Sequence, residues 1–265
     1  MSRADPVGTN NFIPGSQARA NFPYNGIDFP HSRPIGRFSN GFNSADVLGY
    51  PPPFLSLVNN LSGLTNHSIK GINFASGGAG ILDITGQSMH YIDCAYHIVL
   101  IQNDLMGTMG QAAMEKFLSK SLIFISIGSN DIFAYYHSNS SLSKQDFMSN
   151  LVLTYENHLK DLLNLGARKF GLISVPPIEE LNDQARAFHA TGMKYSLGNT
   201  FEMTLSVIGD PLSFNFKEVK IACCGVRKFN AESICDPKEN LCLNHKDHCS
   251  GIYFTQHRLL LSLQL

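Results

Sequence analysis

The residues best suited to chemistry follow a short apolar run, Ile123–Ile127, in the sequence Gly128-Ser129-Asn130-Asp131. The run has the length and β-branched content of a buried strand in a parallel sheet, covered on both faces. Parallel sheets hold their chemistry in the turns at the carboxyl ends of their strands. Asn130 therefore stands where a carboxamide could act on a substrate, although an Asx turn that closes the strand is the simpler alternative.

A second strand-like segment, residues 69–74, runs into the glycine-rich sequence Ala75-Ser76-Gly77-Gly78-Ala79-Gly80. Such a turn could present backbone N–H groups to a phosphate, but the sequence has neither G-x-G-x-x-G nor the lysine of a P-loop. An oxyanion hole needs a backbone donor in a tight turn and a side-chain donor such as Asn, both aimed at one point. We therefore predict that Gly77 and Asn130 are the two oxyanion donors.

A series of motifs resembles the plant GDSL esterase/lipase family of the SGNH hydrolase superfamily. The motifs occur in that family's order and cover nearly the whole chain: Thr9–Phe12, Gly36–Gly41, Asn73–Gly80, Gly128–Asp131, Gly166–Phe170, Ser174–Ile178 and Ala222–Gly225. The resemblance implies an α/β fold, a three-layer α/β/α sandwich around a parallel sheet with flavodoxin-like strand order. It also implies a single domain over residues 1–265, incomplete at both ends.

The resemblance further implies a serine ester hydrolase that acts on small-molecule, lipid or acetylated-polymer esters and needs no cofactor or metal. In that mechanism a serine attacks the ester carbonyl and a histidine takes and returns its proton. An aspartate three residues before the histidine orients the ring. Gly77 and Asn130 match the family's two oxyanion positions.

The amino-terminal sequence differs from the family where the family has its nucleophilic serine. The family opens with a strand ending in Phe-Gly-Asp-Ser, whereas this chain begins Met1-Ser2-Arg3-Ala4-Asp5. Ser2 keeps the Ser-x-x-Asp spacing and is the candidate nucleophile, although chain termini fray unless other residues hold them. Because the family's first strand lies inside the sheet, we expect a sheet without that strand and a destabilised fold.

The carboxyl-terminal sequence differs from the family where the family has its catalytic histidine. After Leu241–Asn244 the family continues with Phe-Trp-Asp-x-x-His-Pro-Thr, but this chain continues with a different sequence. The codons for Cys249–His257 can be read in a shifted frame as Phe-Trp-Asp-Leu-Phe-His-Pro-Thr, which indicates a frame shift near Cys249. His257 is then a coincidence rather than the base.

These departures, with an interior gap after Ile178 and another near Ala190–Met193, favour a catalytically impaired family member. One alternative is a non-catalytic binding or interaction protein that keeps the family's cleft. Another is a splice product without function.

The composition limits the remaining functions. With 43% hydrophobic residues and a net charge of −1, the chain can form a substantial core but lacks the basic surface that nucleic acids require. No apolar stretch approaches the roughly 20 residues of a transmembrane helix. The family is extracellular, but the amino terminus has no signal-peptide pattern, so we expect a cytoplasmic product if the chain is translated as written.

Four cysteines are grouped late in the chain: Cys223, Cys224, Cys235 and Cys242. Their grouping predicts a small set of disulfides, as in proteins of oxidising compartments. Residues 242–249 also hold two cysteines and two histidines at the short spacing of zinc sites. Adjacent His248 and Cys249 are poorly placed for one tetrahedral centre, so we expect no metal.

Local patterns predict the elements of repeated βα units. Ser143 is the expected N-cap of a helix whose apolar residues recur at helical spacing until Gly166 ends it. Residues 169–175 and 193–197 are predicted strands. Pro14–Phe42, rich in Gly, Pro, Asn and aromatic residues, is a predicted ordered loop.

Overall fold

The structure is a computed structural model that describes residues 9–16, 19–34, 36–42, 46, 48–49, 51–58, 69–83, 85, 94–138, 140–174, 192–225 and 241–249. The chain divides into two compact units. The first contains residues up to Gly77, a short piece at Ser88–His90, and residues from Thr204 onward. The second contains Gly78–Gln87 and Tyr91–Met203. The single domain predicted for residues 1–265 stays a prediction.

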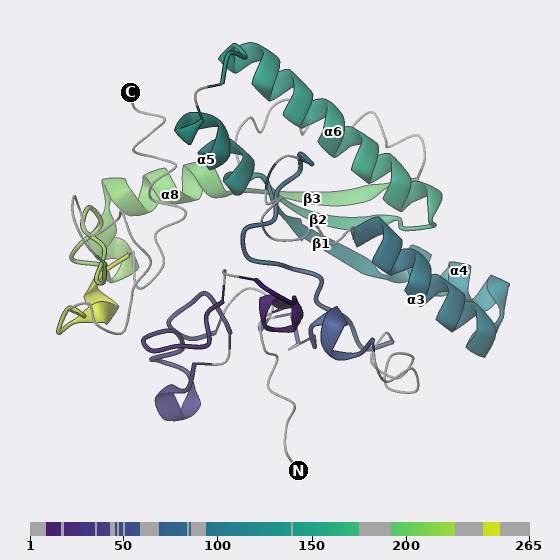
Figure 1. The fold of residues 1–265 in the computed structure, drawn as a ribbon, viewed down its shortest axis with the longest axis horizontal. Coiled ribbons are helices and arrows are strands. Elements are labelled where there is room, and N and C mark those ends of the chain that lie inside the picture. The colour runs from purple at the N-terminus through teal and green to yellow at the C-terminus, as the bar shows by residue number, and fades with distance from the viewer. Residues whose placement is uncertain are drawn as a thin grey trace. The chain divides into compact units, whose positions relative to one another are not determined.

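A parallel sheet of three strands lies in the second unit, in the order β1 (Leu122–Ser126), β2 (Lys169–Ser174) and β3 (Lys194–Asn199) (Figure 1). Leu122 is the register partner of Lys169, which in turn pairs with Lys194. Parallel neighbours need a crossover connection. Helices α5 (Ser129–His137) and α6 (Lys144–Asn164) supply it between β1 and β2. The α/β fold class and these predicted strands are confirmed.

Strand β1 is an edge strand within the described part of the chain, and the prediction that it is covered on both faces is wrong. Leu122 is 56% exposed and Phe124 is 38% exposed. Exposure alternates along the strand because the pleat turns successive side chains to opposite faces. The Phe124 ring lies against Gly171 of β2, where an added Cβ would come within 2.8 Å of it. An apolar run alone does not reveal which faces other elements cover.

Helix α6 forms as its sequence predicts. The Ser143 hydroxyl accepts the N–H of Asp146 at 3.1 Å and donates to the Asp146 carboxylate at 2.7 Å, so it satisfies one N–H group of the first turn. Gly166 ends the helix with φ +101°. Burial raises the pKa of Tyr155 on the apolar face. That face consists of Phe147, Leu151, Tyr155, Leu159, Leu162 and Leu163.

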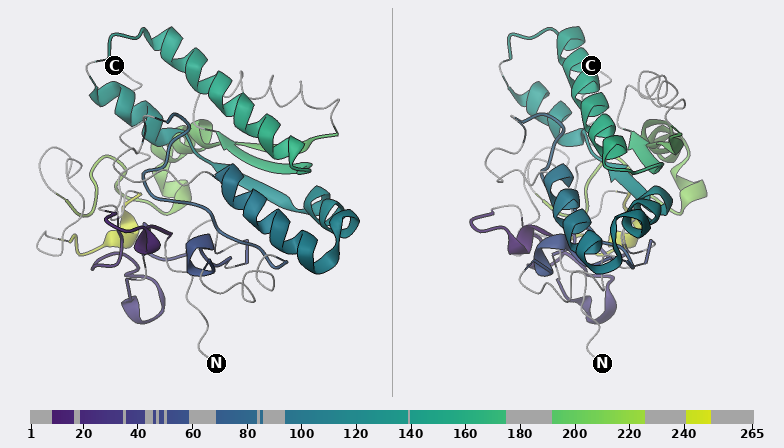
Figure 2. Two further views of the ribbon diagram at one scale, coloured as in Figure 1. Left: turned by 45° about the vertical axis from the view of Figure 1, so that its right-hand side comes forward. Right: turned by 90° about the vertical axis from the view of Figure 1, so that its right-hand side faces the viewer.

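Helix α3 (Cys94–Met109) packs against α4 (Gln111–Lys120) and against α6. The side chain of Gln102 donates to the carbonyl of Leu165 at 2.6 Å, which ties α3 to the end of α6. In both views of Figure 2 the carboxyl end of α6, in teal, lies near α3, in blue. Helix α8 (Thr200–Gly209) follows β3. No described helix is long and apolar enough to cross a membrane.

The first unit consists mainly of loops, turns and short 3₁₀ helices. These helices are Thr9–Phe12, Pro30–Ser32, Phe54–Ser56, Pro211–Phe214 and His245–Asp247. The described residues between Pro14 and Phe42 form turns and one such helix, which confirms the predicted ordered loop. The strand predicted at residues 69–74 is wrong, because within the described residues Asn73 makes only an isolated bridge to Pro53.

Candidate active site

Asn130 and Asp131 lie in the first turn of α5, which begins directly after β1. Gly128 has φ +116°, so it can make a sharp turn from strand to helix that a residue with a side chain would resist. The structure therefore has the start of helix α5 at this position, and not the Asx turn that was the simpler alternative. This position, at the carboxyl end of a parallel strand, is where ligands bind in open α/β sheets.

Asp131 anchors the glycine-rich turn. Its carboxylate, in a residue only 1% exposed, accepts the N–H groups of Ile81 and Leu82 at 2.8 Å each. Nε2 of His158 on α6 lies 3.3 Å from the carbonyl oxygen of Ile81. Hydrogen bonds to an ionised acceptor are roughly twice as strong as neutral ones, so this turn is firmly held. The sequence motifs did not predict this role, although the acidic residue directly after the predicted oxyanion Asn is a signal for it.

Asn130 reaches the same turn. Its Nδ2 donates to the carbonyl of Ala79 at 2.8 Å. A carboxamide nitrogen carries two hydrogens, so one N–H of Asn130 is left for a substrate oxygen. Asn130, Asp131, Ala79 and Ile81 all belong to the second unit, which therefore contains the turn from Gly78 onward and the side chains that fasten it.

Gly77 belongs to the first unit, where its backbone pairs with the side chain of Asn10. Oδ1 of Asn10 accepts the Gly77 N–H at 2.7 Å and the Ser76 hydroxyl at 3.0 Å, while Nδ2 donates to the Gly77 carbonyl at 2.9 Å. The Phe38 ring occupies the place that a side chain at residue 77 would need, so only glycine fits. Since Gly77 and Asn130 lie in different units, their convergence on one oxyanion stays a prediction.

Gly80 leaves no room for a side chain. An added Cβ would collide with Thr85 and lie 2.6 Å from Oδ1 of Asp131. We therefore expect Gly80→Ala to lower the free energy of unfolding, measured in urea, by about 1–3 kcal/mol. Gly107→Ala in α3 is the matched control, because an added Cβ there meets nothing within 4 Å. It should stabilise the helix by up to ~1 kcal/mol. If the two variants were equally stable, the turn would accommodate an added Cβ at residue 80 without a loss of stability.

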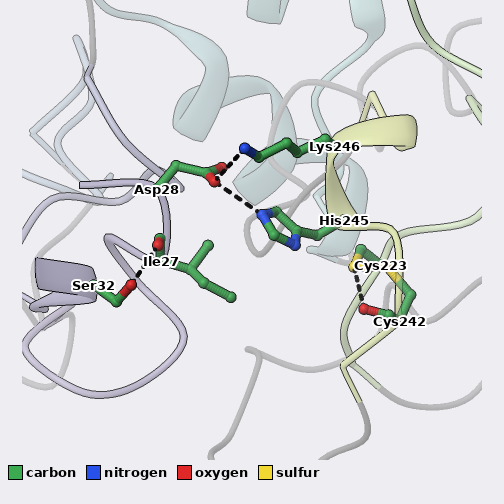
Figure 3. A network of polar contacts seen from close by, with 7 residues as sticks. All are labelled: Ile27, Asp28, Ser32, Cys223, Cys242, His245 and Lys246. Atoms are coloured by element: carbon green, nitrogen blue, oxygen red, sulfur yellow. Dashed lines mark hydrogen bonds and ion pairs between the residues drawn. A yellow bond between two sulfur atoms is a disulfide. The ribbon is translucent and has the colours of Figure 1, made fainter. Parts of the chain in front are cut away.

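The first unit also contains an Asp–His pair that the sequence motifs did not predict. His245 Nε2 lies 3.0 Å from Oδ1 of Asp28, and Lys246 Nζ lies 3.6 Å from the same oxygen (Figure 3). A carboxylate that holds an imidazole is the arrangement that orients a general base. Ser32, drawn nearby, instead donates its hydroxyl to the carbonyl of Ile27 at 2.9 Å. The pair therefore joins two loops that are distant in the sequence, and the Ser32 hydroxyl is bound to a backbone carbonyl instead of to the imidazole.

The candidate nucleophile Ser2 lies outside the described residues, and its role stays a prediction. His257 and Cys235 lie outside them as well.

Cys223 and Cys242 form a disulfide with their Cα atoms 5.0 Å apart, as their grouping predicted. Cys242 is therefore unavailable to a metal, which removes the zinc alternative for residues 242–249. Within the described part of the chain, no group of three His, Cys, Asp or Glu side chains could hold a metal ion. Burial raises the pKa of the Cys249 thiol, so this cysteine forms the reactive thiolate less readily.

A family model described as GDSL-like Lipase/Acylhydrolase matches residues 9–226. The Arabidopsis thaliana GDSL esterase/lipase At5g55050 is 31% identical over 288 aligned positions, which cover 91% of this chain and 76% of the relative. The Arabidopsis thaliana GDSL esterase/lipase LTL1 is 29% identical, over 89% of this chain and 76% of the relative. The motif order, the parallel sheet and these matches agree, and the chain belongs to the plant GDSL esterase/lipase family.

Proposed function

We propose that this chain acts on carboxylic esters, with substrates among small-molecule, lipid or acetylated-polymer esters. Family membership supports ester hydrolysis as the reaction. The observation that carries the proposal is the bond from Asn130 Nδ2 to the Ala79 carbonyl, which fixes a side-chain donor on the glycine-rich turn beside β1. Fixed donors stabilise the oxyanion that forms when a nucleophile attacks an ester carbonyl.

We also propose that a protein made of residues 1–265 hydrolyses esters only weakly. The family's Asp-x-x-His block does not follow Leu241–Asn244, where residues 245–265 have a different sequence. This departure affects the group that would activate the nucleophile. Oxyanion donors alone still contribute roughly a hundredfold or more in rate, so a low residual activity is consistent with this proposal.

Hydrolysis of p-nitrophenyl butyrate by the purified protein tests these proposals. The expected rate is slightly above the buffer background and is the same in the wild type, in Ser2→Ala and in the control Ser32→Ala. Ser32 is a suitable control because it is exposed and its hydroxyl is bound to the carbonyl of Ile27. A high turnover that only Ser2→Ala abolishes would identify Ser2 as the nucleophile and contradict the proposed impairment.

A non-catalytic binding protein is the second candidate function. It is favoured by the bond between the Gly77 N–H and Asn10, because that bond occupies one of the two donors that an oxyanion would need. Binding of an ester or its carboxylate product without turnover would support it. The Cys223–Cys242 disulfide favours an oxidising compartment for either candidate, in line with the extracellular family.

A further inference from the structure

Phe38 places an aromatic ring against the glycine-rich turn. Cε2 and Cζ, at the far end of the ring, are the atoms nearest to a Cβ added at Gly77, and Cζ would lie 2.8 Å from it. The ring therefore touches the residue that the sequence motifs place beside the ester carbonyl. Phe38 is only half-buried, so part of its side chain is exposed to solvent next to this turn.

Both sides of this contact are held by other residues of the first unit. Arg37, which directly precedes Phe38, is bound to the Asp46 carboxylate in a buried pair. The side chain of Asn10 bonds to both the N–H and the carbonyl of Gly77. The ring and the turn are therefore positioned before any ligand arrives, which lowers the entropic cost of binding.

A phenyl ring can recognise only the apolar part of an ester, because it has neither a hydrogen-bond donor nor a strong acceptor. The alcohol part of a glycerol or sugar ester carries hydroxyl groups, whereas the acyl chain consists of methylene groups beyond the carbonyl. Each methylene group removed from water favours binding about fourfold. An acetyl group has no methylene group, so it gains least from a neighbouring ring.

We propose that Phe38 is a specificity-determining residue whose ring contacts the acyl chain of the substrate, so that the protein prefers esters with aliphatic acyl chains to acetyl esters. This inference rests on the proposed ester hydrolase function and names the part of the ester that is selected. It favours lipid and other aliphatic esters over acetylated polymers as substrates.

Amide NMR titrations of the full chain with acetate and with octanoate test the inference without a nucleophile. The Gly77 resonance reports binding, and the apparent Kd should be at least about tenfold lower for octanoate. In Phe38→Ala the two Kd values should agree within about threefold. Phe42→Ala is the matched control and should keep the preference, because Phe42 is 56% exposed and its ring packs on Phe29. An unchanged preference in Phe38→Ala would overturn the inference.

A second measurement needs no variant and remains decisive if Phe38→Ala does not fold. In the wild type, the methylene protons of bound octanoate should give intermolecular NOEs to the ring protons of Phe38. A shift of the Gly77 resonance without these NOEs would overturn the inference. Absence of octanoate binding at this turn would overturn it as well.

Hydrolysis of p-nitrophenyl octanoate and p-nitrophenyl acetate separates this inference from the proposed function. The ratio of kcat/KM for the octanoate ester to that for the acetate ester should fall at least about tenfold in Phe38→Ala and stay unchanged in Phe42→Ala. Octanoate binding that depends on Phe38, without turnover of either ester, would contradict only the hydrolase function. Turnover with the same ratio in the wild type and in Phe38→Ala would contradict only the role of Phe38.

Discussion

Replacing Arg37 by alanine should lower the free energy of unfolding by about 3–5 kcal/mol, because it leaves the carboxylate of a buried ion pair without its cation. Nε and Nη2 of Arg37 donate to both oxygens of Asp46 at 2.7–3.1 Å, and both side chains are only 3% exposed. The guanidinium also lies over the Phe29 ring, 4.4 Å from its centroid. The loss is measured as the shift of the urea unfolding midpoint.

Arg33→Ala is the matched control, since Arg33 is exposed in the same loop and its loss should change stability by less than about 0.5 kcal/mol. The double variant Arg37→Met, Asp46→Leu should recover much of the stability, because it removes both buried charges together. If Arg37→Ala were no less stable than Arg33→Ala, the ion pair would not hold this loop.

Asp131→Ala should cost about 3 kcal/mol or more in the stability of the second unit. The carboxylate accepts two backbone N–H groups, from Ile81 and Leu82, and hydrogen bonds to charged groups contribute about 1.5–3 kcal/mol each. Urea unfolding measures the total, and hydrogen exchange at the Ile81 and Leu82 amides shows whether the turn opens. Both amides should lose protection.

Asp131→Asn provides a graded comparison, because an amide keeps one acceptor oxygen and should lose less stability than alanine. Asp161→Ala on the exposed face of α6 is the control and should change stability by less than about 0.5 kcal/mol. Retained protection at Ile81 and Leu82 in Asp131→Ala would mean that other contacts fix the turn.

The parts of the fold that the sequence predicted correctly depend on local signals. Helix α6 combines an N-cap at Ser143, an apolar residue every three or four positions and a glycine at its end, and each signal acts within a few residues. Strand β2 contains the short apolar run Gly171–Ile173, and in β3 the apolar Tyr195 and Leu197 alternate with polar residues. The order of the sequence motifs indicated the fold class, which no single helix or strand pattern could specify.

The features that the sequence did not predict depend on distant partners. The exposure of Phe124 follows from which elements cover β1, and the bonds of Asp131 follow from where residues 81–82 pass. The bond between Asn10 and Gly77 joins residues 67 positions apart. Spacing cannot reveal such contacts, because tertiary placement decides which acceptor each N–H group meets.

Among the described strands, β1 has a neighbour on one side only, and an open strand edge affects how a protein behaves in concentrated solution. The strand contains no proline and no charge, and the described residues leave one side of its backbone ladder unfilled. An uncharged apolar edge of this kind is a template on which another extended chain can add, within a crowded expression host or in a concentrated stock. We therefore expect Leu122→Lys, at a position already turned to solvent, to reduce precipitation of concentrated protein.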